Sequence, residues 1–244
     1  YIKHVRSVLK SLNDSNLKIN LCKCEFFKKE VKFLGHLISL LGVRPVPSWL
    51  ETISNLTLPK TIANLRSFLG TVNFYHRFIP HLSTALAPLS ELASGPKNSI
   101  VQWTKKATNT FHSLKTILTG LVALKFYNPS LELQLTTDAS DVWVGAVLHQ
   151  ISTNGLEPLE FFSKKINSAQ RNYSTFDREL LAIYEAVKHF RNLLEGRTFT
   201  ILTDHKPLIH LCVLKNPSPR QLRQITFFPN SIFHFHTYPG KTTS

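Results

Sequence analysis

The sequence predicts a mixed α/β fold, with a sheet and packed helices in its second half and a mainly helical stretch before it. Leu131, Leu133 and Leu135 alternate with polar residues, which is the pattern of a half-buried strand. Residues 174–196 carry apolar side chains at helical spacing, and a second strand-like run covers 198–203. The order strand, helix, strand predicts a sheet covered by helices.

Three carboxylates occupy the ends of these predicted elements. Asp138 closes the first strand-like run, Glu179 lies in the early turns of the helix, and Asp204 closes the second run. Both aspartates have the parity of the polar face, so they reach the same side if their strands are neighbours. Acids at element ends are typical of sites that bind divalent metal ions. Taken singly, an aspartate after a strand is more often a turn or cap residue, and that alternative stays open.

The helix that carries Glu179 has a recognisable start. Ser174 is the expected N-cap, and Asp177 three residues later forms a weaker version of a capping box. Glu179 shares a stripe with Ile183 and Ala186, so we expect its side chain near the buried face of the helix.

The composition favours a polyanionic partner. Lys and Arg number 29 against 15 Asp and Glu, which gives a formal charge of +14 and a pI near 9.8. Nucleic-acid binding fits this balance, and a generic basic protein is the alternative. The chain of 244 residues allows one or two domains. It contains no Met and starts at Tyr1, so we expect a piece of a longer polypeptide.

Cysteine usage and hydropathy argue against several other classes. Cys22, Cys24 and Cys212 do not make a disulfide framework, and Cys212 lacks the usual zinc spacing to His205 and His210. The sequence has no run of about 18 apolar residues, so no membrane span is expected. The first residues also lack the apolar region of a signal peptide, so an intracellular protein without a membrane partner is expected.

Stretches around the three acids form an ordered series of motifs. They read TTDASDVWVGAVLHQ (136–150), FSKK (162–165), QRNYST (170–175), RELLAI (178–183) and TDHKPL (203–208). This series resembles the ribonuclease H domain in pol polyproteins of Gypsy-type LTR retrotransposons. The preceding half resembles the end of the same element's reverse transcriptase, in KCEFF (23–27), VKFLGH (31–36), LRSFLG (65–70) and FIP (78–80). The resemblance covers essentially the whole chain in family order.

The resemblance implies a ribonuclease H-like mixed sheet with packed helices, preceded by a helical thumb and connection and a short palm remnant. The expected parts are 1–44 for the end of the palm, 45–120 for the thumb and connection, and 121–244 for the ribonuclease H-like domain. The polymerase acids of the family would lie before Tyr1. A further Asp of the family would fall just past Ser244, so truncation of the domain is expected. Trp143 stands where small residues are common in the family.

The activity implied by the resemblance is endonucleolytic cleavage of RNA in RNA–DNA hybrids, as part of RNA-directed DNA synthesis. Asp138, Glu179 and Asp204 would hold two magnesium ions, for which manganese can substitute. The implied partners are the hybrid, a template–primer duplex, and the upstream fingers and palm of the reverse transcriptase. The alternative is a catalytically inactive nucleic-acid-binding or structural remnant.

Candidate nucleic-acid contacts come from three segments. They are Phe33, Leu34, Gly35, His36, Arg66, Asn73, Tyr75, Arg77 and His205. The first four match the family segment that grips the primer strand, and a plain hairpin with a glycine turn is the alternative. The next four lie on a predicted helix and could follow a phosphate backbone, or they could form only its solvated face. His205 and His210 are candidates for supporting roles.

The expected elements are as follows. Helices are predicted at 2–12, 49–56, 61–78, 81–93, 104–119, 174–195 and 206–213. Strands are predicted at 17–21, 31–38, 157–163 and 198–203, with a strand hairpin at 131–150 and a short hairpin-like tail at the end of the chain.

Overall fold

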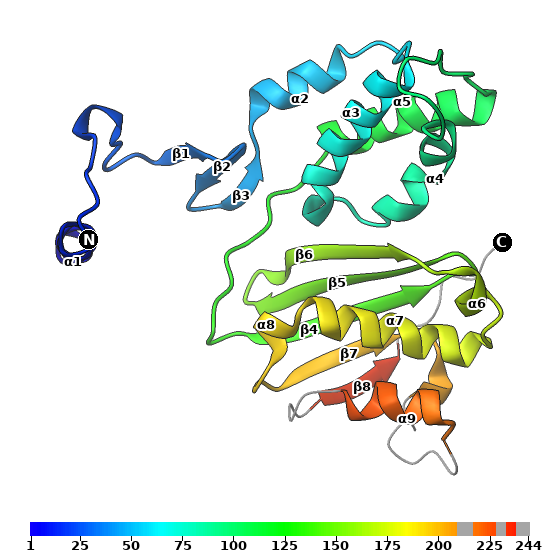
Figure 1. The fold of residues 1–244 in the computed structure, drawn as a ribbon. Coiled ribbons are helices and arrows are strands. Elements are labelled where there is room, and N and C mark those ends of the chain that lie inside the picture. Colours follow the sequence, from blue (N-terminus) through cyan, green and yellow to red (C-terminus); the bar gives the residue numbers. More distant parts are fainter. Residues whose placement is uncertain (209–216, 228–232, 238–244) are drawn as a thin grey trace.

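The computed structural model describes residues 1–208, 217–227 and 233–237 of the chain. Within these residues, an N-terminal arm with a small sheet is followed by a group of helices and then by a larger sheet (Figure 1). The predicted helix at 206–213 lies mostly outside the described residues, and His210, Cys212 and Ser244 lie wholly outside them.

The N-terminal arm contains helix α1 and a three-stranded antiparallel sheet. Its elements are α1 (Ile2–Asp14), the 3₁₀ turn η1 (Leu21–Lys23), β1 (Glu30–Phe33), β2 (His36–Ser39) and β3 (Gly42–Pro45). The strand predicted at 17–21 is wrong, because this exposed segment has no neighbouring strand to pair with. The segment 31–38 holds two strands and not one, because Leu34 and Gly35 turn the chain with φ angles of 46° and 79°.

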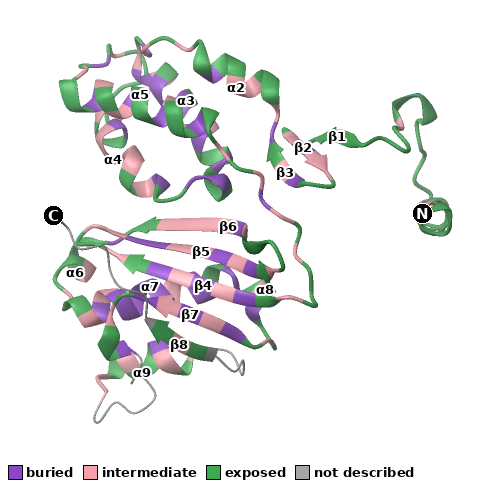
Figure 2. Cartoon of the chain, turned by 180° about the vertical axis from the view of Figure 1, so that it is seen from behind, coloured by how far each residue is buried: buried purple, intermediate pink, exposed green. Residues whose placement is uncertain are grey.

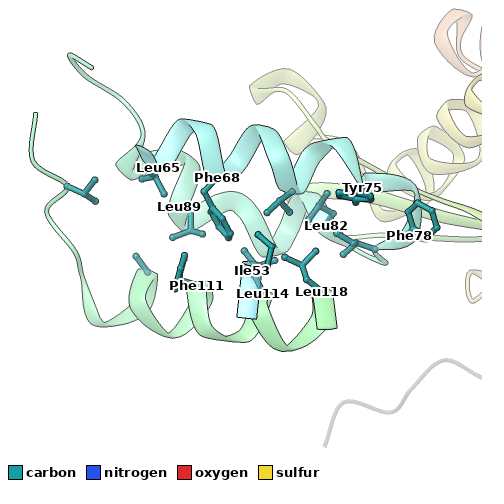
Figure 3. Close-up of a cluster of buried hydrophobic side chains, with 14 of the residues drawn as sticks. Ile53, Leu65, Phe68, Tyr75, Phe78, Leu82, Leu89, Phe111, Leu114 and Leu118 are labelled. Carbon is teal, nitrogen blue, oxygen red and sulfur yellow. The ribbon is translucent and has the colours of Figure 1, made fainter. Parts of the chain in front are cut away.

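The helical part has one continuous apolar core (Figure 3). Its elements are α2 (Pro47–Ser54), α3 (Ile62–Phe74), the 3₁₀ turn η2 (His76–Phe78), α4 (Leu82–Leu92) and α5 (Lys105–Thr119). Thr61 and Thr104 cap α3 and α5 through their side-chain oxygens. Phe68 and Phe111 meet at 5.0 Å between ring centroids in the middle of the core. The predicted helix at 61–78 ends at Phe74 and continues only as η2.

The larger sheet has five strands in the order β6-β5-β4-β7-β8. Its strands are β4 (Glu132–Ala139), β5 (Trp143–Ser152), β6 (Gly155–Lys165), β7 (Phe199–Thr203) and β8 (Phe233–Thr237). Strands β4, β5 and β6 are antiparallel neighbours, whereas β7 runs parallel to β4 and β8 parallel to β7. The expected hairpin-like tail is therefore wrong, because a helix precedes β8 and returns the chain in the parallel direction.

Helices lie on one face of this sheet. They are α6 (Ser168–Arg171), α7 (Thr175–His189), α8 (Arg191–Leu194) and α9 (Pro219–Thr226). The apolar side of α7 packs on Leu133 and Leu135 of β4 and Leu148 of β5, and α9 packs beside α7. Figure 2 shows the sheet from the other side, where α7 lies behind the strands. No helix in the described parts of the chain is long and apolar enough to cross a membrane.

The helical part packs against edge strand β6 through η2 and α4. Ser83 donates its backbone N–H to Oγ of Ser163 at 2.8 Å and its hydroxyl to the Ser163 carbonyl at 3.0 Å. Arg77 of η2 forms an ion pair of 2.9 Å with Glu160 of β6, and Nε2 of His189 on α7 lies 3.1 Å from the same carboxylate. These contacts fix the position of the helices relative to the sheet.

Replacing Gly42 by Ala is expected to lower the free energy of unfolding by about 3 kcal/mol. A Cβ at Gly42 would lie 2.1 Å from the Leu124 carbonyl oxygen, and φ there is +123°, where L side chains are strained. Gly70→Ala on α3 is the matched control, because a Cβ there meets nothing within 4 Å and Ala favours a helix. Chemical denaturation of both variants gives the two values. Equal stability of the two variants would contradict this close approach of β3 to Leu124.

Candidate functional site

The pairing of β4 with β7 brings two of the predicted acids together. The parallel register pairs Leu135 with Ile201 and Thr136 with Leu202, so two residues further it sets Asp138 beside Asp204. Both side chains are exposed, and both line a cavity of about 440 Å³. Along their strands, Asp138 and Asp204 alternate with the buried residues that face α7, so they belong to the opposite face of the sheet, as the alternation of the sequence predicts.

Glu179 approaches the same strand ends from helix α7. Its side chain is 4% exposed, and its Oε2 atom is buried without a hydrogen-bond partner. Burial, and after it the charges of Asp204 and Asp138, raise the pKa of the Glu179 carboxyl to about 8, although the Ala139 backbone N–H donates to it and Arg178 opposes the change. The three acids therefore share one electrostatic environment, even though they come from three elements.

The donor set fits a hard divalent cation in its chemistry. All three side chains offer carboxylate oxygens, and the buried Oε2 of Glu179 has a free lone pair and negative neighbours. Among the residues that the structure describes, no three His, Cys, Asp or Glu side chains are arranged to hold a metal ion. The exposed Asp138 and Asp204 would therefore have to turn towards Glu179 on binding.

Two polar contacts that the sequence analysis missed hold the start of α7 in place. Arg178 forms an ion pair of 2.6 Å with Asp141, which lies in the turn after Asp138. Asp177 accepts hydrogen bonds from Arg220 at 2.9 Å and Gln221 at 2.8 Å, which joins α7 to α9. The predicted N-cap is confirmed, since Ser174 Oγ accepts from the Asp177 N–H at 3.1 Å.

The predicted primer-grip segment forms the turn between β1 and β2. Phe33 and Leu34 are 58% and 74% exposed, and the ring of His36 stacks on Phe78 at 5.6 Å. Phe33, Leu34 and His36 also line a mainly apolar groove of about 460 Å³, together with Arg77. These features agree with a contact surface and equally with a hairpin docked on the helical part, so the role of the segment stays a prediction.

The other candidate contacts have different environments. Arg66 donates to the carbonyls of Ala93 and Gly95, at the end of α4. Tyr75 is buried and donates its hydroxyl to the Gly35 carbonyl at 2.8 Å, while Asn73 is exposed. Arg77 forms an ion pair with Glu160, and His205 is half-buried with its ring edge-on to Phe176 at 5.8 Å between ring centroids.

Comparisons with known proteins agree with this architecture. Residues 103–201 match the family described as the RNase H-like domain found in reverse transcriptase. The chain is 40% identical over 212 residues to the Transposon Tf2-3 and Tf2-4 polyproteins of Schizosaccharomyces pombe, in alignments that cover 86% of this chain. It spans only 16% of the length of these relatives.

Solved structures with the same fold extend over both halves of the chain. The foamy viral protease-reverse transcriptase in complex with double-stranded DNA has a TM-score of 0.79, with 22% identity and coverage of 100% of this chain and 51% of that chain. The same protein in complex with an RNA/DNA hybrid has a TM-score of 0.78, with 22% identity and coverage of 100% and 33%.

The sheet order, the helix α7 and the preceding helices thus define a ribonuclease H-like unit that follows the end of a reverse transcriptase. The chain belongs to this region of the Gypsy-type LTR retrotransposon polyproteins.

Proposed function

We propose that this chain takes part in RNA-directed DNA synthesis by cleaving the RNA strand of RNA–DNA hybrids. The observation that carries the proposal is that two carboxylates at the ends of β4 and β7 lie near enough to the buried Glu179 of α7 to raise its pKa. Asp138 and Asp204 each come two residues after the last register pair of the parallel strands β4 and β7, and the buried Glu179 carries an oxygen without a hydrogen-bond partner. In the described part of the chain none of these three acids forms a salt bridge, and a cation would relieve the repulsion between them.

Magnesium, or manganese in its place, is the group that Asp138, Glu179 and Asp204 would hold. When bound, it would supply an activated water and stabilise charge on the leaving oxygen. The chain's own contribution is to fix the acids. The Arg178–Asp141 ion pair joins the turn after Asp138 to the helix that carries Glu179, and so maintains the relative position of two ligands on separate elements.

The substrate class follows from charge and from the relatives. The chain carries a net charge of +14, which suits a duplex of nucleic acid. The foamy viral protein of the same fold was solved with double-stranded DNA and with an RNA/DNA hybrid. We propose the hybrid and the template–primer duplex as partners, together with the upstream fingers and palm of a reverse transcriptase.

The second candidate function is nucleic-acid binding without catalysis. It is favoured by one observation, namely that no described group of three ligand side chains is arranged to hold a metal ion. A cleavage assay separates the two functions. The chain is incubated with a hybrid labelled on either strand, with magnesium, with manganese or with a chelator.

We expect metal-dependent fragments of the RNA strand only, with the DNA strand and a DNA duplex of the same sequence left intact. Binding of the hybrid is measured in parallel by fluorescence anisotropy. Tight binding without cleavage in either metal would favour the inactive alternative, whereas absence of binding would contradict both functions.

Hybrid binding is expected to weaken steeply with salt and to depend little on sequence. Each phosphate contact that a basic side chain neutralises contributes about −0.9 to the slope of log affinity against log salt concentration. Titrations of two hybrids of unrelated sequence at several salt concentrations measure that slope. A flat response would mean that the excess of Lys and Arg does not form a binding surface.

A further inference from the structure

A smaller cavity, of about 220 Å³, lies next to Asp138 between the sheet and the helical part. We call it the junction subsite and define it by its main lining residues. They are His81, Thr84, Asp138, Ser140, Trp143 and Ser163. Of these six residues, only Asp138 belongs to the group of three acids. The other five come from two separate walls, one on the β4–β5 turn and β6 and one at the start of α4.

Trp143 forms the indole wall of the junction subsite, and the preceding turn holds its backbone. Ser140 Oγ accepts from the backbone N–H of Trp143 at 3.0 Å, and the backbone N–H of Ser140 donates to the Trp143 carbonyl at 2.8 Å. Asp141 in the same turn is tied to Arg178. The indole is half-buried, and the Lys165 ammonium lies 5.4 Å from its ring centroid. A planar aromatic surface and a cation are thus presented together beside Asp138.

The imidazole wall comes from the helical part. His81 precedes α4 in the left-handed conformation, with φ of 50°, and its side chain is exposed. A Cβ at Gly145 would lie 3.4 Å from His81 Nδ1, so the ring sits directly over Gly145, which is the cross-strand partner of Asp138. The two Ser83–Ser163 hydrogen bonds keep this turn on β6.

The combination of groups selects a class of ligand. Indole and imidazole rings offer stacking surfaces, which accept any base because every base has a π-face. The Lys165 ammonium beside Trp143 supplies the charge that a phosphate requires. The junction subsite also opens on the acid that we place at the reacting centre, and the main cavity shares His81, Asp138 and Gly145 with it.

We propose that the junction subsite binds one nucleotide of the substrate strand next to the cleaved position, with its base or sugar on Trp143 and its backbone near His81. This inference rests on the proposed function, which supplies the strand. It makes the helical part a direct contributor to substrate placement, because His81 reaches the site from outside the ribonuclease H-like sheet.

The test measures binding without catalysis. An RNA–DNA hybrid is titrated into the chain in the presence of a chelator, and both affinity and tryptophan emission are recorded. We expect Trp143→Ala to weaken binding about five- to a hundredfold, as loss of one base stack does. Trp143→Phe should keep the affinity within about threefold, since it keeps an aromatic face. His81→Ala is expected to weaken binding about two- to tenfold.

Trp103→Phe is the matched control, because Trp103 packs against the helical core, donates to the Pro59 carbonyl and does not line the subsite. It should bind like the original chain and keep the quenching of emission by the hybrid, whereas Trp143→Phe should lose most of that quenching. Thermal unfolding verifies that all variants fold.

The outcomes distinguish failure of the junction subsite from failure of the proposed function. If the original chain binds the hybrid and Trp143→Ala binds as tightly as Trp103→Phe, the junction subsite is refuted and the proposed function stands. The junction subsite is also refuted, and the proposed function stands, if the hybrid still quenches the tryptophan emission of Trp143→Phe. If the original chain does not bind the hybrid at all, the proposed function fails and the subsite fails with it.

Discussion

Replacing Glu179 by Gln is expected to make the metal-free chain several kcal/mol more stable at alkaline pH while leaving its stability near pH 4.5 almost unchanged. In the folded chain the pKa of Glu179 is raised from 4.5 to about 8, chiefly by burial and then by Asp204 and Asp138. The unfolded chain therefore releases this proton at lower pH than the folded chain does. Stability is complete below the unfolded pKa and falls as pH rises towards the folded pKa.

The size of the effect follows from the pKa change. Each tenfold difference between the two dissociation constants corresponds to about 1.4 kcal/mol, so the loss is on the order of 5 kcal/mol. Gln removes the ionisation and keeps the shape of the side chain, so the variant should show no such fall. The measurement is urea denaturation in chelator at a series of pH values between acid and alkaline conditions.

Glu185→Gln is the control for this series, because Glu185 lies on the same helix but forms an ion pair of 2.8 Å with Lys164. It should retain the fall in stability with pH. If Glu179→Gln has a pH profile parallel to that of the original chain, the pKa of Glu179 is not raised in the folded state, and the electrostatic basis of the metal centre is removed.

The part of the site that sequence could predict is the part that strand and helix periodicity determine. The alternation around Leu133 and Leu135 gives the parity of Asp138, and the stripe on α7 gives the burial of Glu179. Asp138 and Asp204 are neighbours only because β7 pairs with β4. Residue patterns alone allow this pairing but do not require it. The ordered family motifs supplied that step.

Contacts made across the fold could not be predicted in the same way. Arg66 and Arg77 look like phosphate-binding residues on a helix, yet one binds the carbonyls at the end of α4 and the other binds Glu160. Tyr75 is buried against the N-terminal hairpin. These partners are 27 to 83 residues away along the chain, so no local pattern identifies them. His81 was missed for the same reason.

Asp138→Asn is expected to reduce cleavage of the RNA strand by about three orders of magnitude or more while hybrid binding and folding persist. The amide has nearly the same size as the carboxylate but lacks the negative charge that a divalent ion requires. Glu132→Gln is the matched control, because Glu132 is exposed on the same strand with the same parity, six positions before Asp138. That variant should cleave like the original chain.

The same substitution gives a second readout that does not need activity. The charge of Asp138 is one of the causes that raise the pKa of Glu179, so Asp138→Asn should make the alkaline loss of stability smaller, although burial of Glu179 still maintains part of it. Loss of cleavage together with a smaller pH effect identifies Asp138 as a member of the acid group. If cleavage continues and the pH profile is unchanged, Asp138 is only a residue at the end of a strand. In that case the metal centre cannot consist of these three acids.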